Sequence, residues 1–316
     1  MKTAFLFSGQ GSQYPAMGKE LLEIIPEKGE EILSAAEKIL GYDIWKIIQE
    51  GTAEELARTR VSQPAIFTVS LLALAAAESR GLTFEGVAGH SLGEYAAMVA
   101  AGVLTMEEGY TAIGYRAEAM EKAAKANPGA MAAVIGLPAE KVVEICYKVK
   151  YEGKYVTAAN LNSPVQTVIA GTMDGIMEAG RLLNAEGAKR IVTLAVSAAF
   201  HSEMMKDAAS EFKAAVSDIE FKEPKVKYYS NVLGRELTDF DDMPDLMAKH
   251  ICSAVRFTDE LHAMQKDGFD TFVELGPGKV LTGLVGKTLT GVKAMNIENA
   301  ATLEAAVQQM GEGEGE

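Results

Sequence analysis

The stretch at residues 86–95, which reads GVAGHSLGEY, constrains the fold of this chain more than any other. Residues 89–93 (GHSLG) match the G-x-S-x-G pattern, between a short apolar run and a helix-like run. That is the strand–turn–helix context of a nucleophile elbow, in which glycines on both sides leave room for a sharply folded backbone. A helix starting behind the serine directs its free N–H groups toward developing negative charge. The pattern predicts Ser91 as a nucleophile; the alternative is an ordinary glycine-rich turn with an N-capping serine.

Composition excludes several classes of function. The chain has 30 Lys and Arg against 44 Asp and Glu, a net charge of −14, whereas binding to nucleic acid or anionic membrane needs a basic surface. No stretch approaches the roughly 20 apolar residues of a membrane span, and the N-terminus lacks the long apolar run of a signal peptide. Cys146 and Cys252 match no metal or redox spacing, so buried free thiols are expected. We expect a soluble cytoplasmic protein.

The order of predicted elements divides the chain into two units. Turn residues between apolar segments predict the order β-α-β-β-α-β, the ferredoxin-like unit, with strands at 130–137, 155–161, 165–171 and 189–196 and helices at 139–150 and 173–186. Outside it, alternating strands and helices indicate a parallel sheet. We therefore expect an α/β-hydrolase-like domain (1–126 and 198–310), a ferredoxin-like insertion (127–197) and a flexible acidic tail (311–316).

A glycine-rich loop follows the first expected strand at 3–7. Residues 8–13 read SGQGSQ, which lacks both the P-loop lysine and the G-x-G-x-x-G spacing of a dinucleotide site. The loop instead brings a backbone N–H, that of Gln10, toward another part of a site. Taken alone, this is a weak signal.

Two polar residues fall on apolar helices. Arg116 lies within the apolar stripe of a helix expected at 106–125 behind a capping box at Thr105. A buried arginine needs an anionic partner, either a structural salt bridge, which spacing alone favours, or a substrate carboxylate. Gln63 belongs to Ser62-Gln63-Pro64, expected to begin a helix that runs to about Arg80. Gln63 either faces a ligand or caps the helix, and capping is favoured.

His201 follows the strand predicted to end at residue 196. Ser91 also follows a strand, so the two side chains could meet above the sheet, with His201 as the base. A lone histidine is more often structural, and that alternative stays open. Among the other histidines, His90 points away from the site by geometry, and His250 and His262 lie in helix-like runs.

Five stretches together resemble a known family, the malonyl-CoA:acyl carrier protein transacylases of fatty acid synthesis. They are residues 8–13 (SGQGSQ), 63–65 (QPA), 89–95 (GHSLGEY), 162–164 (NSP) with 200–201 (FH), and 274–281 (ELGPGKVL). The resemblance covers nearly the whole chain, and the inserted ferredoxin-like domain agrees with it.

The resemblance implies roles for individual residues. Ser91 would take the acyl group from coenzyme A as an ester, with His201 as base and then acid. Backbone N–H groups of Gln10 and Leu92 would form the oxyanion hole. Arg116 would clamp the malonyl carboxylate, which reverses the salt-bridge preference stated above.

Further implied residues complete the expected site. Phe200 would disfavour a branched methylmalonyl group, and Gln63 would contribute to substrate binding. Backbone carbonyls near residue 250 would orient His201 in place of an aspartate. Most of the family has glutamine where this chain has His250. That change is tolerable if only the backbone carbonyl of residue 250 orients His201. If the side chain also matters, His250 adds a second titratable ring near the base, which would shift the pH profile.

Several functions remain open on sequence alone. An esterase or thioesterase would fit the elbow equally well, and a non-catalytic scaffold for carrier protein or a transacylase serving polyketide synthesis or malonate decarboxylation would fit the resemblance. The expected partners are malonyl-CoA and acyl carrier protein, with no metal, no cofactor and a monomeric state. Carrier proteins are typically acidic, so docking needs a local basic patch, for which Lys189, Arg190 and Lys206 are candidates.

Overall fold

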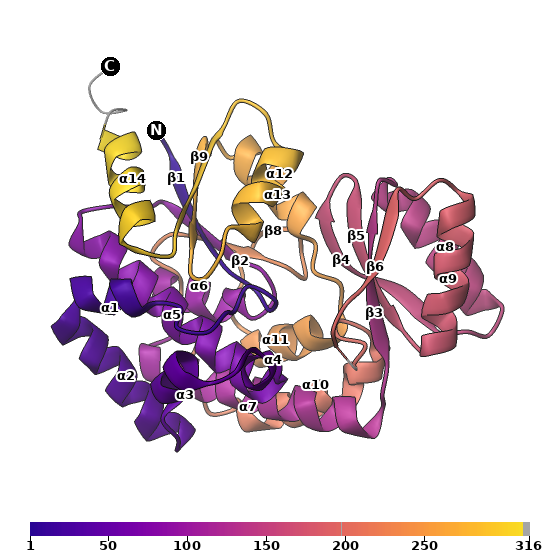
Figure 1. The fold of residues 1–316 in the computed structure, drawn as a ribbon, viewed down its shortest axis with the longest axis horizontal. Coiled ribbons are helices and arrows are strands. Elements are labelled where there is room, and N and C mark those ends of the chain that lie inside the picture. The colour runs from indigo at the N-terminus through magenta and orange to yellow at the C-terminus, as the bar shows by residue number, and fades with distance from the viewer. Residues whose placement is uncertain (197, 312–316) are drawn as a thin grey trace.

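The computed structural model describes residues 1–196 and 198–311, which form two units side by side (Figure 1). The larger unit contains a six-stranded sheet in the order β10-β9-β1-β2-β7-β8, in which every neighbouring pair is parallel except β7 with β8. These strands are β1 (Thr3–Phe7), β2 (Gly86–Gly89), β7 (Lys227–Ser230), β8 (Arg235–Glu236), β9 (Thr271–Leu275) and β10 (Lys293–Ile297). The predicted parallel sheet is therefore confirmed.

Both faces of this sheet are covered by helices, as the composition of β1 requires. All five residues of β1 are buried; Phe5 and Phe7 belong to one hydrophobic cluster and Ala4 and Leu6 to another. The first cluster includes α5 (Thr59–Ser79), α6 (Gly93–Ala101) and α7 (Met106–Ala126), and the second includes α12 (Phe257–Lys266) and α13 (Val280–Thr288). A continuous apolar strand of this kind is typical of a doubly covered parallel sheet.

The remaining helices of the larger unit surround this core. They are α1 (Lys19–Ile24), α2 (Pro26–Leu40), α3 (Ile44–Glu50), α4 (Ala53–Ala57), the short 3-10 helix η1 (Glu203–Met205), α10 (Lys206–Ala215), α11 (Met243–Cys252) and α14 (Ala300–Gly311). The capping boxes predicted at Thr52 and Thr105 are both present, at the starts of α4 and α7.

Helix α5 departs from the sequence prediction at its start. It begins at Thr59 rather than at Ser62, so Pro64 lies inside the helix and neither Ser62 nor Gln63 caps it. Proline cannot donate to the carbonyl four residues back. That carbonyl, of Arg60, accepts a hydrogen bond from the Tyr42 hydroxyl at 3.3 Å instead. The helix is long and apolar enough to span a membrane, but 89% of its most apolar window is buried inside the fold.

The smaller unit has the predicted order β-α-β-β-α-β. It runs β3 (Ala130–Ile135), α8 (Ala139–Tyr151), β4 (Val156–Ser163), β5 (Gln166–Gly171), α9 (Met173–Ala185) and β6 (Arg190–Thr193). Its antiparallel sheet has the order β4-β5-β3-β6, and α8 and α9 cover the side turned away from the larger unit (Figure 1). Strand β6 ends at Thr193, three residues earlier than expected.

The two units are joined by backbone hydrogen bonds as well as by the chain. Leu161 N–H donates to the Val255 carbonyl at 2.8 Å, and Val255 N–H donates to the Ala159 carbonyl at 2.9 Å. Strand β4 is therefore fixed against the segment that follows α11. Residue 197, the predicted end of the insertion, and residues 312–316 of the predicted tail lie outside the described residues; Gly311 is the last residue of α14.

Candidate active site

Ser91 lies on a sharp turn between β2 and α6. Its backbone φ is 55°, a left-handed value that costs free energy for any residue with a Cβ. The flanking glycines allow the close packing that holds the turn. A Cβ on Gly89 would lie 2.0 Å from the Gly93 carbonyl carbon, and one on Gly93 would lie 2.1 Å from the Phe7 oxygen. The turn has the geometry predicted for a nucleophile elbow.

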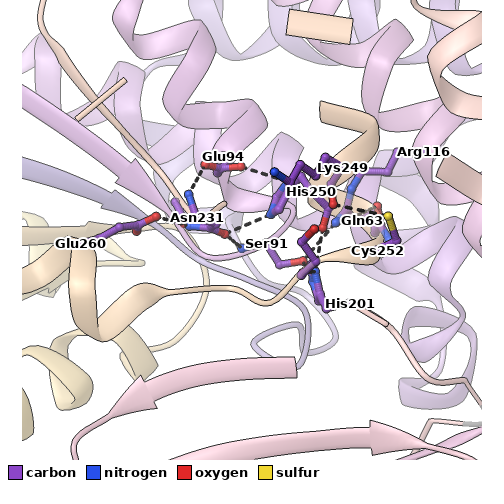
Figure 2. Close-up of polar contacts among 12 residues, drawn as sticks. Gln63, Ser91, Glu94, Arg116, His201, Asn231, Lys249, His250, Cys252 and Glu260 are labelled. Carbon is purple, nitrogen blue, oxygen red and sulfur yellow. Dashed lines mark hydrogen bonds and ion pairs between the residues drawn. The ribbon is translucent and has the colours of Figure 1, made fainter. Parts of the chain in front are cut away.

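The Ser91 hydroxyl contacts the ring of His201. Its Oγ lies 2.7 Å from His201 Nε2, and His201 Nδ1 lies 3.0 Å from the His250 carbonyl and 3.1 Å from the Ser253 carbonyl (Figure 2). Carbonyls only accept hydrogen bonds, so the proton of the neutral ring is on Nδ1 and Nε2 is free to accept from Ser91. The structure thus brings the two predicted residues together, with backbone carbonyls on the far side of the ring.

The environment of His201 keeps its ring uncharged. Burial lowers the pKa of His201 well below 6.5, and the neighbouring His250 and Arg116 groups lower this pKa further. A neutral imidazole with a free Nε2 is the form that can take a proton from a hydroxyl.

Arg116 also reaches the Ser91 hydroxyl. Its side chain is 0% exposed; one guanidinium nitrogen donates to Gln63 Oε1 at 2.6 Å and the other to Ser91 Oγ at 3.1 Å. Both partners are uncharged, and among the described residues Arg116 forms no ion pair, so the structural salt bridge considered from sequence is absent. A buried guanidinium without an anion beside the nucleophile is suited to receiving a carboxylate. Burial lowers the pKa of Arg116, and nearby Tyr95 and Glu94 oppose the shift.

Gln63 holds this guanidinium in place. Its Oε1 accepts from Arg116, and its Nε2 lies 3.5 Å from Met120 Sδ. The capping role favoured from sequence is wrong, because α5 begins four residues before Gln63 and carries this side chain on its buried face.

A second set of polar residues lies behind the elbow and was not assigned from sequence. Asn231 Oδ1 accepts the Ser91 backbone N–H at 2.7 Å, and Asn231 also contacts His250 Nε2 at 3.1 Å and Glu260 at 2.8 Å. Glu94 Oε2 lies 2.9 Å from His250 Nδ1 (Figure 2). Burial, and then the charge of Glu94, raises the pKa of Glu260 well above its usual range. Glu94 inside an apolar helix and Asn231 just after a strand were the available sequence signals.

A cavity of about 300 Å³ opens onto the reactive pair. Ser91, His201, Gln10 and Phe200 are among the residues that line it. The Phe200 side chain, beside His201, is only 6% exposed. The backbone N–H groups of Gln10 and Leu92 donate to no described residue, which leaves them available to a bound group. Parallel pairing of β1 with β2 sets the loop of Gln10 beside the elbow.

Three other expectations have definite outcomes. His90 lines the same cavity as Ser91 and His201, but its Nε2 is paired with Asn162 Oδ1 at 2.8 Å and not with either of them. Cys146 is a buried free thiol, as expected, but Cys252 is only partly buried. Of the three basic candidates for docking, Lys206 lies 3.7 Å from Glu203, while Lys189 and Arg190 are exposed at the start of β6.

Comparison with known proteins places the chain in a family. A family model described as an acyl transferase domain matches residues 4–309. A malonyl CoA-acyl carrier protein transacylase of Bacillus subtilis (strain 168) is 41% identical over 311 residues, 98% of this chain and 98% of the relative. The protein of that name from Escherichia coli (strain K12) is 36% identical over 306 residues, 96% of this chain and 98% of the relative.

Solved structures agree. A malonyl CoA-acyl carrier protein transacylase from Clostridium perfringens superimposes with a TM-score of 0.94 at 32% identity, covering 99% of this chain and 98% of that one. A malonyl-transacylase in complex with a type II PKS acyl-carrier protein gives a TM-score of 0.93 at 33% identity, covering 98% and 100% of the two chains. Agreement in sequence and fold over nearly the full length shows that the chain is an acyltransferase and belongs to the malonyl-CoA:acyl carrier protein transacylase family.

Proposed function

We propose that this chain transfers the malonyl group from malonyl-CoA to the phosphopantetheine thiol of acyl carrier protein, through a malonyl ester on Ser91. The observation that carries the proposal is the double contact of Ser91 Oγ, at 2.7 Å from His201 Nε2 and 3.1 Å from Arg116. One contact supplies a base for the nucleophile, and the other supplies a cation for the free carboxylate of a malonyl group. The product would supply fatty acid synthesis.

The first half-reaction acylates the enzyme. Ser91 Oγ attacks the thioester carbonyl while its proton passes to His201 Nε2, and the resulting oxyanion accepts hydrogen bonds from the backbone N–H groups of Gln10 and Leu92. The C–S bond then breaks, coenzyme A leaves, and His201 returns the proton to the thiolate. The carbonyls of His250 and Ser253 keep the ring aligned in both directions.

The second half-reaction reverses the first with a different thiol. His201 takes the proton of the phosphopantetheine thiol, and the sulfur of that thiol attacks the carbonyl of the Ser91 ester. The bond between Ser91 Oγ and the acyl carbon then breaks, and His201 returns the proton to Oγ, which regenerates the serine hydroxyl. Thioester, ester and thioester are close in free energy, so the site needs to stabilise the oxyanion and keep water from the ester.

Selection of malonate would rest on Arg116 and Phe200. A guanidinium binds a carboxylate through two parallel hydrogen bonds, whereas an acetyl group leaves it without an anion. Phe200, beside His201, would exclude a methyl branch on the substrate. Gln63 would hold the guanidinium in register for the carboxylate.

The finer structural and cellular descriptions are part of the same proposal. We describe the larger unit as α/β-hydrolase-like and the smaller unit as ferredoxin-like, with domain limits near residues 127 and 197, and we expect a monomeric cytoplasmic enzyme. Lys189, Arg190 and Lys206 are all exposed and remain the candidates for carrier-protein docking. Charge reversal of these residues should raise the KM for carrier protein and leave the KM for malonyl-CoA unchanged. A KM for carrier protein equal to that of wild type would remove them as candidates.

Steady-state kinetics with malonyl-CoA and holo acyl carrier protein test the proposal. A ping-pong mechanism predicts parallel double-reciprocal lines and malonyl carrier protein as the product. Release of free malonate at the same rate without carrier protein would identify a hydrolase, and intersecting lines would exclude the covalent intermediate.

A further inference from the structure

The side-chain amide of Asn231 bridges two backbone groups of the elbow. Its Nδ2 donates to the Gly89 carbonyl at 2.7 Å, and its Oδ1 accepts the Ser91 N–H at 2.7 Å. Rotating the amide by half a turn would set its NH2 group against an N–H and its oxygen against a carbonyl, so the observed orientation is the one that fits. The amide therefore ties the end of β2 to the residue whose backbone is strained.

The other hydrogen of Asn231 Nδ2 is bound by Glu260 on α12. Glu260 Oε1 accepts it at 2.8 Å, and the Glu260 side chain is 0% exposed (Figure 2). Without this acceptor, one hydrogen of the amide would lie in a buried site with no partner, which is destabilising. Glu260 thus completes the set of contacts that hold Asn231 against the elbow.

Glu260 has no cation to balance a negative charge. Its other oxygen, Oε2, forms no hydrogen bond, and its carboxyl group enters no ion pair with a described residue. The cations on α12 and on the adjoining β7 have other partners, Arg256 with Asp259 and Lys227 with Glu236. A buried carboxylate that accepts a single hydrogen bond is costly, so the group is expected to keep its proton.

A second buried carboxyl group makes ionisation of Glu260 still less favourable. Glu94 on α6 accepts the Asn231 backbone N–H at 2.7 Å, so two buried carboxyl groups lie within one hydrogen bond of the same residue. Two like charges in one such site repel each other. Burial, and then Glu94, raises the pKa of Glu260 well above its usual 4.5, in agreement with these contacts.

The other titratable side chains around Glu260 supply no compensating charge. They are Tyr228 on β7, His90 beside the elbow and His250 on α11. Burial raises the pKa of Tyr228 and lowers the pKa of His90, so both are uncharged near pH 7. His250 Nε2 lies 3.1 Å from Asn231 Oδ1, at the end of the amide that faces away from Glu260.

We propose that Glu260 is a positioning residue for Ser91 and that it works as an uncharged carboxylic acid. The proton lies on Oε2, because Oε1 accepts the hydrogen bond from Asn231. Glu260 holds the Asn231 amide, and this amide holds the elbow in the conformation that presents the Ser91 hydroxyl. The effect on acylation rests on the proposed function of Ser91, whereas the protonation state of Glu260 does not.

The uncharged acid makes the stability of the protein depend on pH. In the unfolded chain Glu260 ionises near pH 4.5, and in the folded protein its pKa is well above that value. Between these two pKa values the folded state binds one more proton, so stability falls as pH rises, by up to about tenfold in the unfolding constant per pH unit. Glu260→Gln has no proton to lose there. Its stability relative to wild type should therefore be greater at pH 7.5 than at pH 5.

Denaturant unfolding of wild type and Glu260→Gln at the two pH values measures this difference. The ratio of their unfolding constants should change at least tenfold between pH 5 and pH 7.5. Glu23→Gln, at an exposed position on α1, is the matched control, and its ratio to wild type should stay constant. A constant ratio for Glu260→Gln would overturn the uncharged form.

Infrared spectroscopy reads the same proton directly in wild-type protein, without any activity. The C=O stretch of a protonated carboxyl group is separate from the bands of a carboxylate. We expect the wild-type minus Glu260→Gln difference spectrum at pH 7.5 to contain a protonated carboxyl band. A carboxylate band in its place would overturn the uncharged form of Glu260.

Acylation kinetics test the positioning role. Glu260→Gln keeps an acceptor oxygen for Asn231 and should retain the wild-type rate of Ser91 acylation within a few-fold. Glu260→Leu has no acceptor, and its rate should fall about tenfold or more, while KM changes little because residue 260 lies behind the elbow. Equal rates in the two variants would overturn the positioning role. If wild type transfers no acyl group, the proposed function fails, and the unfolding and infrared results still decide the protonation state.

Discussion

Ser91 and His201 share a left-handed backbone conformation, with φ of 55° and 56°, while their side chains meet at 2.7 Å between Oγ and Nε2. Neither residue is glycine, so each conformation costs free energy of order 1–3 kcal/mol and persists only if the surroundings enforce it. Asn231 supplies part of that constraint at Ser91, through its 2.7 Å hydrogen bond from the Ser91 N–H. The alignment of nucleophile and base is therefore maintained by the fold around them.

Gly89→Ala should abolish activity and destabilise the protein by roughly 3 kcal/mol or more, as expected for overpacking against rigid backbone. The new Cβ would lie 2.0 Å from the Gly93 carbonyl carbon and 2.2 Å from the Glu94 nitrogen. Chemical unfolding of this variant and of Gly283→Ala provides the comparison. An alanine at Gly283, on α13, would meet nothing within 4 Å and should stabilise by about 0.5–1 kcal/mol. Equal stability of the two variants would contradict the packing argument.

Arg116→Ala should lower kcat/KM for malonyl-CoA by roughly 10²–10⁴, the value of two charge-assisted hydrogen bonds of about 1.5–3 kcal/mol each. The slow reaction with acetyl-CoA should fall much less, so the preference for malonyl-CoA should collapse. Arg116→Lys keeps the charge but cannot form two parallel hydrogen bonds to a carboxylate. Its kcat/KM for malonyl-CoA should therefore lie between those of wild type and Arg116→Ala. Equal losses for both substrates would show that Arg116 supports the site without recognising a carboxylate.

Phe200→Ala should admit a branched acyl group. The ring lines the cavity beside His201 and is 6% exposed, so its removal frees space next to the reacting carbonyl. Rates of adduct formation with methylmalonyl-CoA and malonyl-CoA measure the change. A rise of about tenfold in the methylmalonyl to malonyl ratio is expected for a steric contact of this size. A ratio unchanged from wild type would assign Phe200 to packing alone.

Activity should persist at mildly acidic pH. His201 acts as a base in its neutral form, and burial, followed by His250 and Arg116, lowers its pKa well below 6.5. As pH falls, the ring therefore stays neutral through pH 6.5, and acylation is lost only when pH passes the lowered pKa. The midpoint of the acid limb of kcat/KM should lie below 6.5 in wild type. A midpoint above 6.5 would mean that a different group titrates or that the ring is more solvated than its contacts imply.

Local patterns predicted much of the fold. The capping boxes at Thr52 and Thr105, the β-α-β-β-α-β order and the turn around Ser91 all depend on residues a few positions apart, which is the range over which sequence determines backbone. Ser91 and His201 meet, as predicted, but not above one shared sheet. Strand β2 before Ser91 belongs to the six-stranded sheet, whereas β6 before His201 belongs to the four-stranded sheet and ends at Thr193. The predicted start of α5 was wrong because a proline is usually found in the first turn of a helix, whereas Pro64 lies inside α5. The Arg60 carbonyl that this proline leaves without a backbone donor accepts a hydrogen bond from the Tyr42 hydroxyl instead.

The buried network could not be predicted in the same way. Asn231 and Glu94 are 137 residues apart, and Asn231 and Ser91 are 140 apart, so no periodicity connects them. Only the parallel pairing of β2 with β7 brings the ends of these strands together. The capping role favoured for Gln63 was wrong for a similar reason, because its partner Arg116 lies on another helix, 53 residues away.

The most direct test of the acyl-serine is the intact mass of the protein after brief mixing with malonyl-CoA, followed by peptide mapping. The account predicts a single malonyl adduct on Ser91 in wild type, none in Ser91→Ala, and little adduct from acetyl-CoA. Ser91→Ala removes only the hydroxyl, so its thermal unfolding serves to show that the fold is kept. An adduct that survives in Ser91→Ala, or malonyl transfer to carrier protein without any adduct in wild type, would contradict the central claim.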